Sequence, residues 1–355
     1  MTIKARKFVL RNRPQGLPKT SDFELVEEEI SENLEDGGIK LFKCNTSKNS
    51  DIFGITEILC KAEWLSVDPY MRLVANNLQL GEMMPGVQVA RVIKSRSPEY
   101  EEGSKVVGLF GWRDTTKCNP SLHTEIEYLY PLPDMKSLPE SYAIGSVGRV
   151  GNTAYFGLLD VGCPQPGETV VVSAAAGAVG SLVGQIAKLK GCKVVGFAGS
   201  DEKVDFLLND LGFENAFNYK TVNVPDALVK AAPKGVDVYF DNVGGEFAFH
   251  VTQKMNQGGR IALCGAISSY NRDASQPAMI PFDYTKMIYN NIKLEGLHVL
   301  RWKHRWFEGI NQIRDWILEG KIVVRETVTE GFENMPEAFI RLLKGSNIGK
   351  EVVKC

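Results

Sequence analysis

Hydrophobic and polar positions in the first 145 residues follow a strand-like pattern. Short runs in which apolar and polar residues alternate are separated by prolines and other turn-forming residues. Alternation with a period of two is typical of strands that bury one face. Residues 1–145 are therefore predicted to form a mostly β domain with few helices. The clearest runs are FELVEEEI at 23–30, GVQVARVIKS at 86–95, SKVVGLFGW at 104–112 and HTEIEYLYPLP at 123–133.

The pattern changes between residues 146 and 320, where short apolar runs alternate with longer, helix-like segments. Strands are predicted at 169–174, 193–198, 215–219, 236–241, 258–264 and 293–299. Helices are predicted near 179–190, 201–211, 223–232, 245–256 and 304–319. Six strands in alternation with helices predict a doubly wound parallel sheet. The tail, residues 321–355, returns to strand, helix and strand, and we expect it to fold back onto the first domain.

Small residues fill the turn between the first strand of this sheet and its helix. Ala174, Gly177 and Gly180 form A-x-x-G-x-x-G, and Ala175 with the same two glycines forms a dinucleotide fingerprint whose first glycine is replaced. Such glycines let the backbone approach a pyrophosphate and let the helix pack against the strand, while the helix N-terminal amides face the anion. The predicted pyrophosphate contacts are Ala176, Gly177, Ala178, Val179 and Gly180.

Two other interpretations fit part of this segment. One is a tight turn between strand and helix with no ligand, which the sequence leaves open. The other is a membrane span, because residues 169–187 are almost free of charge and place Gly180 and Gly184 four residues apart. The β-rich start and the small or polar interruptions disfavour one continuous helix. We therefore predict no membrane span.

The end of the second strand indicates which dinucleotide binds. Sites for NAD usually place Asp or Glu there to accept a hydrogen bond from the ribose 2′-hydroxyl. This chain has Gly199 and Ser200 at that place, with Asp201 and Glu202 beyond the strand and Lys203 after them. A lysine offers a charge to a 2′-phosphate, so NADPH is the predicted cofactor. The alternative for Lys203 is a solvated lysine on a helix.

Composition narrows the class of protein. A chain of 355 residues suits two domains, and its net charge of -2 gives no sign of a nucleic-acid or acidic-membrane partner. The N-terminal residues contain no apolar segment typical of a signal peptide. Seven scattered cysteines, no C-x-x-C and four histidines provide neither a disulfide framework nor a zinc site. We expect a cytoplasmic, reduced protein without a metal.

Many short motifs resemble the zinc-free prostaglandin reductase (leukotriene 12-hydroxydehydrogenase, alkenal/one oxidoreductase) family of the medium-chain dehydrogenase/reductase superfamily. The resemblance covers nearly the whole chain. The motifs are WLSVDPYMR (64–72), GVQVARV (86–92), TAYFGLL (153–159), VSAAAGAVGS (172–181), AGSDEK (198–203), NYK (218–220), YFDNVGGEF (239–247), CGAISSYN (264–271), GFENMPEAF (331–339) and NIGK (347–350).

The resemblance implies a GroES-like catalytic domain at 1–145, a Rossmann domain at 146–320 and a return of 321–355 to the catalytic domain. It implies NADPH-dependent reduction of the carbon–carbon double bond of α,β-unsaturated ketones and aldehydes, including 15-oxo-prostaglandins and alkenals. The partner is then a small-molecule enone or enal, and a homodimer is expected. The cysteine and histidine that bind zinc in related enzymes do not occur near VDPYMR. A carbonyl would therefore be activated by hydrogen-bond donors.

Two tyrosines are candidates for such donors. Tyr270 follows the strand predicted to end at Cys264, and the family places the matching tyrosine beside the substrate carbonyl. The alternative is a loop tyrosine with its hydroxyl in water. Tyr70, in VDPYMR, is the second candidate, and the alternatives are a wall of the pocket or a structural tyrosine after Pro69.

The family also implies further cofactor contacts. Tyr219 would join Lys203 at the 2′-phosphate, Asn242 would lie near the adenosine, and Asn347 would close over the nicotinamide. For both asparagines the alternative is a turn residue bonded to its own backbone. The remaining predicted contacts, along the nicotinamide, are Cys264, Gly265, Ala266, Ile267, Ser268, Ser269 and Tyr270 with Leu297, His298 and Val299.

Two segments depart from the family pattern. Where the family usually shows G-M-P-G-L-T, residues 148–153 read GRVGNT, so that Arg149 brings a charge toward the expected substrate cleft. One hypothesis is that Arg149 favours carboxylate-bearing enones, and the alternative is an arginine that reaches solvent or pairs structurally. Residues 39–57 look like an insertion whose polar centre, CNTSKNSD, predicts a surface loop.

Other functions remain open at this stage. A zinc-free NADPH quinone oxidoreductase of the same superfamily would carry the same cofactor motif. A non-catalytic protein that only binds NADPH would do so as well. The motifs VDPYMR and ISSYN favour the alkenal and prostaglandin reductases over the quinone enzymes.

Overall fold

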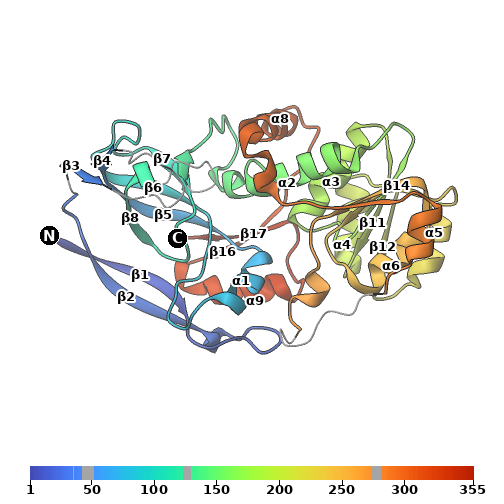
Figure 1. The fold of residues 1–355 in the computed structure, drawn as a ribbon, viewed down its shortest axis with the longest axis horizontal. Coiled ribbons are helices and arrows are strands. Elements are labelled where there is room, and N and C mark those ends of the chain that lie inside the picture. The colour runs from blue at the N-terminus through green and yellow to red at the C-terminus, as the bar shows by residue number, and fades with distance from the viewer. Residues whose placement is uncertain (35, 42–51, 123–128, 273–280) are drawn as a thin grey trace.

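The computed structural model describes residues 1–34, 36–41, 52–122, 129–272 and 281–355. Figure 1 shows two halves side by side along the long axis of the molecule. One half is built around an antiparallel sheet that contains both early and late parts of the chain, and the other around a parallel sheet from the middle of the chain. No helix of the described ranges is long and apolar enough to cross a membrane.

The parallel sheet has six strands in the order β12-β11-β10-β13-β14-β15, and each neighbouring pair is parallel. This order places the first strand, β10, at the centre, where the winding reverses direction. The predicted doubly wound parallel sheet is confirmed. The strands are β10 (Thr169–Val172), β11 (Lys193–Ala198), β12 (Asn215–Asn218), β13 (Val236–Asp241), β14 (Met255–Leu263) and β15 (Lys293–Gly296).

Helices cover both faces of this sheet because alternate strand residues point to opposite sides. Val170 and Val172 pack with residues of α2 and α3, whereas Val171 packs with residues of α5 and α6. The helices of this half are α2 (Arg149–Phe156), α3 (Ala178–Leu189), α4 (Asp201–Asp205), α5 (Val224–Ala231), α6 (Gly245–Gln253), α7 (Tyr284–Tyr289) and α8 (Trp306–Leu318).

The other half contains a sheet in the order β16-β17-β5-β6-β7-β9, with β8 paired to β5. Its strands are β5 (Ile58–Ser66), β6 (Gln88–Ser95), β7 (Lys105–Gly108), β8 (Thr115–Cys118), β9 (Leu129–Pro131), β16 (Glu326–Glu330) and β17 (Lys350–Lys354). A separate hairpin joins β1 (Thr2–Leu10) to β2 (Phe23–Ser31). The helices α1 (Tyr70–Asn77) and α9 (Met335–Leu343) complete this half.

The late strand β17 pairs antiparallel with β5, which places the tail of the chain in the sheet of the first half. This pairing agrees with the expected return of residues 321–355, while the domain boundaries after 145 and 320 stay a prediction. The two ends of the segment predicted as an insertion lie in strands that pair antiparallel with each other. These strands are β3 (Asp36–Leu41) and β4 (Ile52–Thr56). The polar centre of the segment, 44–51, lies outside the described residues.

Several elements differ from the sequence expectation. The helix predicted at 201–211 is present as α4 and a π-helical continuation, Phe206–Asp210. Strand β14 starts at Met255, three residues earlier than expected. The predicted helix at 304–319 is a 3-10 segment, Val299–Arg305, that leads into α8. The short helix α7 was not predicted, because its six residues are too few to show helical periodicity.

Candidate active site

A cavity of about 660 Å³ lies at the carboxyl ends of the central parallel strands. Its walls come from the turn after β10, the ends of β11, β12 and β13, and the loop after β14. Residues 67–70 of the antiparallel half, residues of the returning tail between 342 and 351, and Arg149, Val150 and Thr153 of α2 also line it. Ligands of doubly wound sheets bind at this edge, beside the strand where the winding reverses. A cavity of this size is typical of sites for small molecules and cofactors.

The turn after β10 keeps its backbone close to helix α3. A Cβ placed on Gly180 would lie 2.5 Å from the carbonyl oxygen of Ala174, so only glycine fits there. Ala174 itself adopts a left-handed conformation with φ of 47°, which residues other than glycine adopt at a cost in free energy. Helix α3 starts after Gly177 with no side-chain cap. Its first amides therefore have no intrahelical partner and are available to an anion.

The returning tail braces this turn. The amide of Gly349 donates to the carbonyl of Ala176 at 2.8 Å, and Gly349 forms a parallel bridge with Gly177. Gly349 has φ of 67°, and a Cβ at this position would lie 1.9 Å from the carbonyl oxygen of Arg325. The absence of a side chain at residue 349 lets this backbone pack against the Arg325 carbonyl while its amide bonds to the turn.

Two lysines gather at the end of β11. Lys203 donates from Nζ to the carbonyl of Gly345 at 2.7 Å, and its pKa is lowered first by burial and then by the charge of Lys220. Tyr219 and Lys220 both lie over Gly199, whose Cβ would be 3.3 Å from the Tyr219 ring and 3.5 Å from Lys220 Cε. NAD sites carry a carboxylate near this position. Two ammonium groups here instead favour a ligand with a phosphate on the ribose.

The carboxylate of Asp241 joins the carboxyl ends of β10 and β13. Its Oδ1 accepts from the hydroxyls of Tyr239 at 2.7 Å and Ser173 at 3.2 Å. The same oxygen accepts from the amides of Val243 at 2.9 Å and Gly244 at 2.8 Å. Four donors stabilise a charge that is almost completely buried. Asp241 therefore holds the strand ends that form the floor of the cavity.

The two predicted asparagines are bonded within the protein. Asn242 donates from its side-chain amide to the carbonyl of Ser173 at 2.8 Å, which again joins β13 to β10. Asn347 donates to the carbonyl of Gly349 at 3.0 Å, two residues further along the chain. Neither side-chain oxygen accepts a hydrogen bond from a described residue, so each can still accept one from a ligand. Their contacts with a cofactor stay a prediction.

The hydroxyl of Tyr270 points back into its own loop. It accepts a hydrogen bond from the amide of Ala266 at 3.2 Å, which leaves its own proton free to donate. Burial raises the pKa of Tyr270, the Ala266 amide opposes this rise, and the nearby Cys264 adds to it. The phenol is therefore neutral near pH 7 and can donate to an oxygen in the cavity. Burial also raises the pKa of Cys264 to about 12, so that this thiol stays protonated.

Tyr70, at the start of α1, lines the same cavity from the antiparallel half. Its hydroxyl is buried and forms no hydrogen bond with any residue that the structure describes. Burial raises the pKa of Tyr70, Asp68 raises it further, and the charge of Arg149 opposes both. A buried hydroxyl without a partner costs free energy, and a ligand oxygen in the cavity would satisfy it. The Tyr70 proton is therefore available to a ligand oxygen, and its role as a donor stays a prediction.

The cavity brings together residues from the predicted cofactor segments other than Leu297–Val299. The predicted residues that line it are Tyr70, Ala176, Gly177, Ala178, Val179, Gly180, Lys203, Tyr219, Asn242, Cys264, Gly265, Ile267, Ser268, Tyr270 and Asn347. Ala266, Ser269, Leu297, His298 and Val299 are not among the lining residues. The Leu297 and Val299 side chains pack into the core and His298 is exposed, so for this segment only a backbone contact stays possible as a prediction.

Some residues of the site were missed by sequence reasoning. Lys220 directly follows Tyr219. A second lysine after a predicted strand could have been recognised as a further contact for the 2′-phosphate. Asp241 lies in a quoted motif, but a carboxylate at the end of a buried strand has several possible roles. Lys350 donates from Nζ to the carbonyl of Val67 at 2.7 Å and lies 3.3 Å from Asp68. No local pattern connects residues that are nearly 300 positions apart.

Known proteins resemble the chain along its whole length. A family profile described as "Zinc-binding dehydrogenase" matches residues 178–315, and one described as "N-terminal domain of oxidoreductase" matches residues 40–126. The chain is 47% identical over 354 residues to prostaglandin reductase 1 of Sus scrofa, with 99% of each chain covered. The chain belongs to the prostaglandin reductase family. The resemblance seen in the motifs is thereby confirmed.

Two further proteins are similar to nearly the whole chain. The 2-alkenal reductase (NADP(+)-dependent) of Nicotiana tabacum is 37% identical over 360 residues, which covers 99% of this chain and 97% of the relative. The crystal structure of CurA from Vibrio vulnificus in complex with NADPH has a TM-score of 0.85 at 36% identity, with 98% of each chain covered. The chain thus shares its fold with CurA over 98% of its length.

The description of the matched profile mentions zinc, which raises the question of a metal site in this chain. Within the described ranges, no group of three or more His, Cys, Asp or Glu side chains is arranged to hold a metal ion. The segment WLSVDPYMR forms the end of β5 and the start of α1, and places Asp68 and Tyr70 at the cavity. Asp68 is held by Lys350 and by the hydroxyl of Ser66.

Proposed function

We propose that this protein reduces the carbon–carbon double bond of α,β-unsaturated ketones and aldehydes with NADPH. The observation that carries the proposal is one cavity lined both by the glycine turn after β10 and by Tyr70 and Tyr270, whose hydroxyls have raised pKa values. Relatives named prostaglandin reductase and NADP-dependent 2-alkenal reductase support it. The proposed substrates are accordingly 15-oxo-prostaglandins and alkenals, which places the reaction in lipid metabolism.

The residues of the cavity fit NADPH at both ends. At the turn after β10, the glycine positions 177 and 180 and the uncapped start of α3 suit a pyrophosphate. At the end of β11, Lys203 and Lys220 suit the 2′-phosphate, and Tyr219 offers a ring face to the adenine. The pKa of Lys203 is lowered first by burial and then by the charge of Lys220, and a bound anion would oppose both effects.

When bound, NADPH supplies the hydride, which adds to the β-carbon of the conjugated substrate. The protein supplies position and donors. Tyr270 and Tyr70 would donate to the carbonyl oxygen, where negative charge develops as the β-carbon accepts the hydride. Because both phenols have raised pKa values, they hold their protons while this charge is present. Protonation of the α-carbon completes the reduction.

We also propose that the protein forms a homodimer whose interface includes one edge of the parallel sheet. Strand β15 is the last strand of this sheet, so one side of it has no neighbour among the described strands. Exposed apolar side chains gather on and beside α7, close to this edge. They are Phe282, Tyr284, Ile288, Tyr289 and Leu294. We also expect a cytoplasmic location, which the free thiols of the six described cysteines support.

The test is an NADPH-consumption screen with the purified protein over an enone, an enal, a quinone and an oxo-eicosanoid. The proposal predicts turnover of the enone, the enal and the oxo-eicosanoid, with a saturated carbonyl product. Turnover of the quinone alone would identify a quinone oxidoreductase instead. Tight NADPH binding with no turnover of any of the four would identify a protein that binds NADPH without catalysis.

A further inference from the structure

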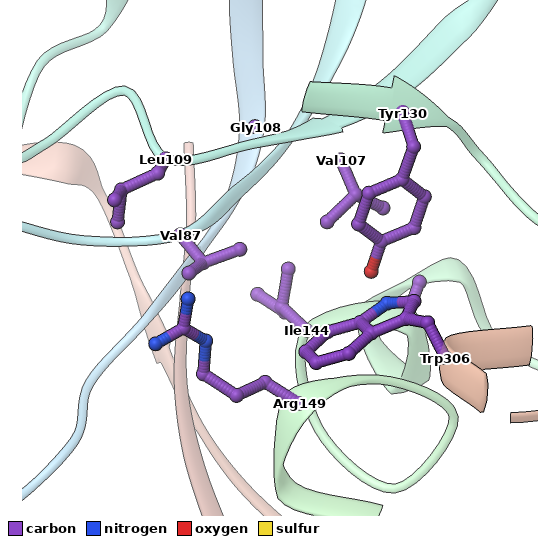
Figure 2. Close-up of a pocket in the computed structure, with 9 residues that line it drawn as sticks. Val87, Val107, Gly108, Leu109, Tyr130, Ile144, Arg149 and Trp306 are labelled. Atoms are coloured by element: carbon purple, nitrogen blue, oxygen red, sulfur yellow. The ribbon is translucent and has the colours of Figure 1, made fainter. Parts of the chain in front are cut away.

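A second, much smaller cavity adjoins the main cavity at Arg149, which lines both of them. Figure 2 shows the Arg149 side chain rising from the start of α2, with Val87 and Leu109 near its guanidinium group. The small cavity has a volume of about 10 Å³, roughly enough for one water molecule. A ligand in the main cavity can therefore reach the guanidinium and extend one small group past it.

The polar side chains of the small cavity are all hydrogen-bond donors. Figure 2 shows the Tyr130 hydroxyl and the Trp306 indole nitrogen directed toward one another across it. Trp306 is 3% exposed and Tyr130 is 5% exposed. Burial raises the pKa of Tyr130, and the facing indole N–H and the charge of Arg149 oppose this rise. The indole N–H nevertheless forms no hydrogen bond of standard geometry with a described residue. The Arg149 guanidinium forms no hydrogen bond or ion pair with any described residue. Arginine and tryptophan can only donate, and tyrosine has one proton to give.

The rest of the lining is apolar and comes from Val87, Val107, Leu109 and Ile144. An apolar surround strengthens electrostatic interactions with a buried charge. A bound water could accept from two of the donors, but its own two protons would find only the Tyr130 oxygen as a side-chain acceptor. An anionic oxygen can accept from all three donors without leaving a proton unpaired.

We infer that Arg149, Tyr130 and Trp306 form a carboxylate subsite that selects enones bearing an acidic group. This inference rests on the proposed function for its substrate and deepens it. The carboxylate would enter from the main cavity and bind Arg149 while one oxygen reaches the donors of Tyr130 and Trp306. The reacting double bond would remain near Tyr70, whose hydroxyl lies within the electrostatic influence of Arg149.

The first experiment compares a medium-chain enone that carries a terminal carboxylate with its methyl ester. The ratio of the two kcat/KM values is the readout, since any general loss of activity cancels in it. We expect the wild type to prefer the acid about tenfold or more, because a charge-assisted hydrogen bond is worth at least a factor of that order. Arg149→Met should bring the ratio to about one, while Arg149→Lys should retain part of the preference.

Two further variants sharpen the test. Trp306→Phe removes the indole N–H but keeps an aromatic ring, and should lower the ratio severalfold. Arg11→Met removes an exposed arginine elsewhere in the molecule and should leave the ratio at its wild-type value. A wild-type ratio near one, or an Arg149→Met ratio equal to that of the wild type, would overturn the subsite.

A binding measurement separates this inference from the proposed reaction. Calorimetry of octanoate with the NADP+-loaded protein requires no turnover. We expect octanoate to bind the wild type about tenfold more tightly than Arg149→Met, and binding to weaken as ionic strength rises. If no enone is reduced but this difference is found, the proposed function fails and the carboxylate subsite stands. Equal binding by both proteins, or no binding to either, contradicts the subsite.

Discussion

At the scale of single residues, the site depends on groups whose surroundings hold them in one protonation state. Tyr270 and Tyr70 have raised pKa values and stay neutral donors, while the pKa of Lys203 is lowered by burial beside Lys220. Sequence reasoning identified the tyrosines and Lys203 because they stand next to recognisable motifs. It missed Asp241 and Lys220, because the roles of these residues depend on strands that meet only in the fold.

Lys203→Ala should reduce the preference for NADPH over NADH. Loss of a charge-assisted contact to the 2′-phosphate costs about 1.5–3 kcal/mol, which corresponds to a fall of about 10- to 100-fold in the ratio of the two kcat/KM values. Lys230→Ala, which removes an exposed lysine of α5, is the control and should leave the ratio unchanged. If Lys203→Ala also leaves it unchanged, the assignment of Lys203 to the phosphate is wrong.

Tyr270→Phe should lower kcat for an enone while NADPH affinity changes little. Removal of one donor from a developing oxyanion typically costs about 100- to 1,000-fold in kcat. The loss would be smaller if Tyr70 shares the charge, so Tyr70→Phe and the double variant belong to the same series. Tyr100→Phe, in a core away from the cavity, is the control. A Tyr270→Phe variant with wild-type kcat would remove this residue from catalysis.

At the scale of elements, the parallel strands were the easiest part to predict. Strands β11 and β13 have the predicted bounds, 193–198 and 236–241, because each is a nearly continuous apolar run. The strand-to-helix turn was also predictable, because closely spaced glycines and alanines between a strand and a helix are typical of a dinucleotide-binding turn. The contact between this turn and Gly349 was not predictable from the sequence. It joins segments about 170 residues apart, and it uses only backbone atoms, which leave no side-chain signal.

Gly349→Ala should destabilise the protein and weaken NADPH binding. The matched control is Gly320→Ala, because Gly320 has nearly the same φ, 70° against 67°, but open space where the Cβ would lie. Both variants incur about 1–2 kcal/mol of left-handed strain. Only Gly349→Ala must also displace the Arg325 carbonyl, which we expect to cost a further ~1–3 kcal/mol. Thermal unfolding and NADPH titration measure both effects.

If the two glycine variants have the same free energy of unfolding and the same NADPH affinity, the tail does not brace the turn. If both variants lose the same stability but only Gly349→Ala binds NADPH more weakly, the contact made by Gly349 affects the cofactor site and not the stability of the fold. Because the Gly349 backbone both packs against Arg325 and supports the turn, we expect the two variants to differ in both quantities.

At the scale of the whole molecule, two sheets of different kinds meet at one cavity. The parallel sheet supplies the turn and the strand ends, and the antiparallel half supplies residues 67–70. The returning tail belongs to the antiparallel sheet through β17 and yet contacts the turn of the parallel half through Gly349. This connection ties both walls of the cavity to one segment, 347–351.

The molecule should be a dimer in solution. Light scattering after size exclusion should give about twice the chain mass of 39.3 kDa. Ile288→Glu places a charge among the exposed apolar residues near β15 and should shift the mass toward the monomer. Leu80→Glu, at another exposed apolar position, should remain dimeric. A monomeric wild type, or a dimer that Ile288→Glu does not affect, contradicts the proposed interface.

The central claim is that this cavity directs a hydride from NADPH to the β-carbon of a conjugated carbonyl. The most direct measurement uses NADPH deuterated at the transferring position, an α,β-unsaturated ketone, and NMR of the product. We expect a saturated ketone with deuterium on the β-carbon and a proton from solvent on the α-carbon. Deuterium on the former carbonyl carbon of an allylic alcohol, or no transfer of deuterium to the ketone at all, would contradict the claim.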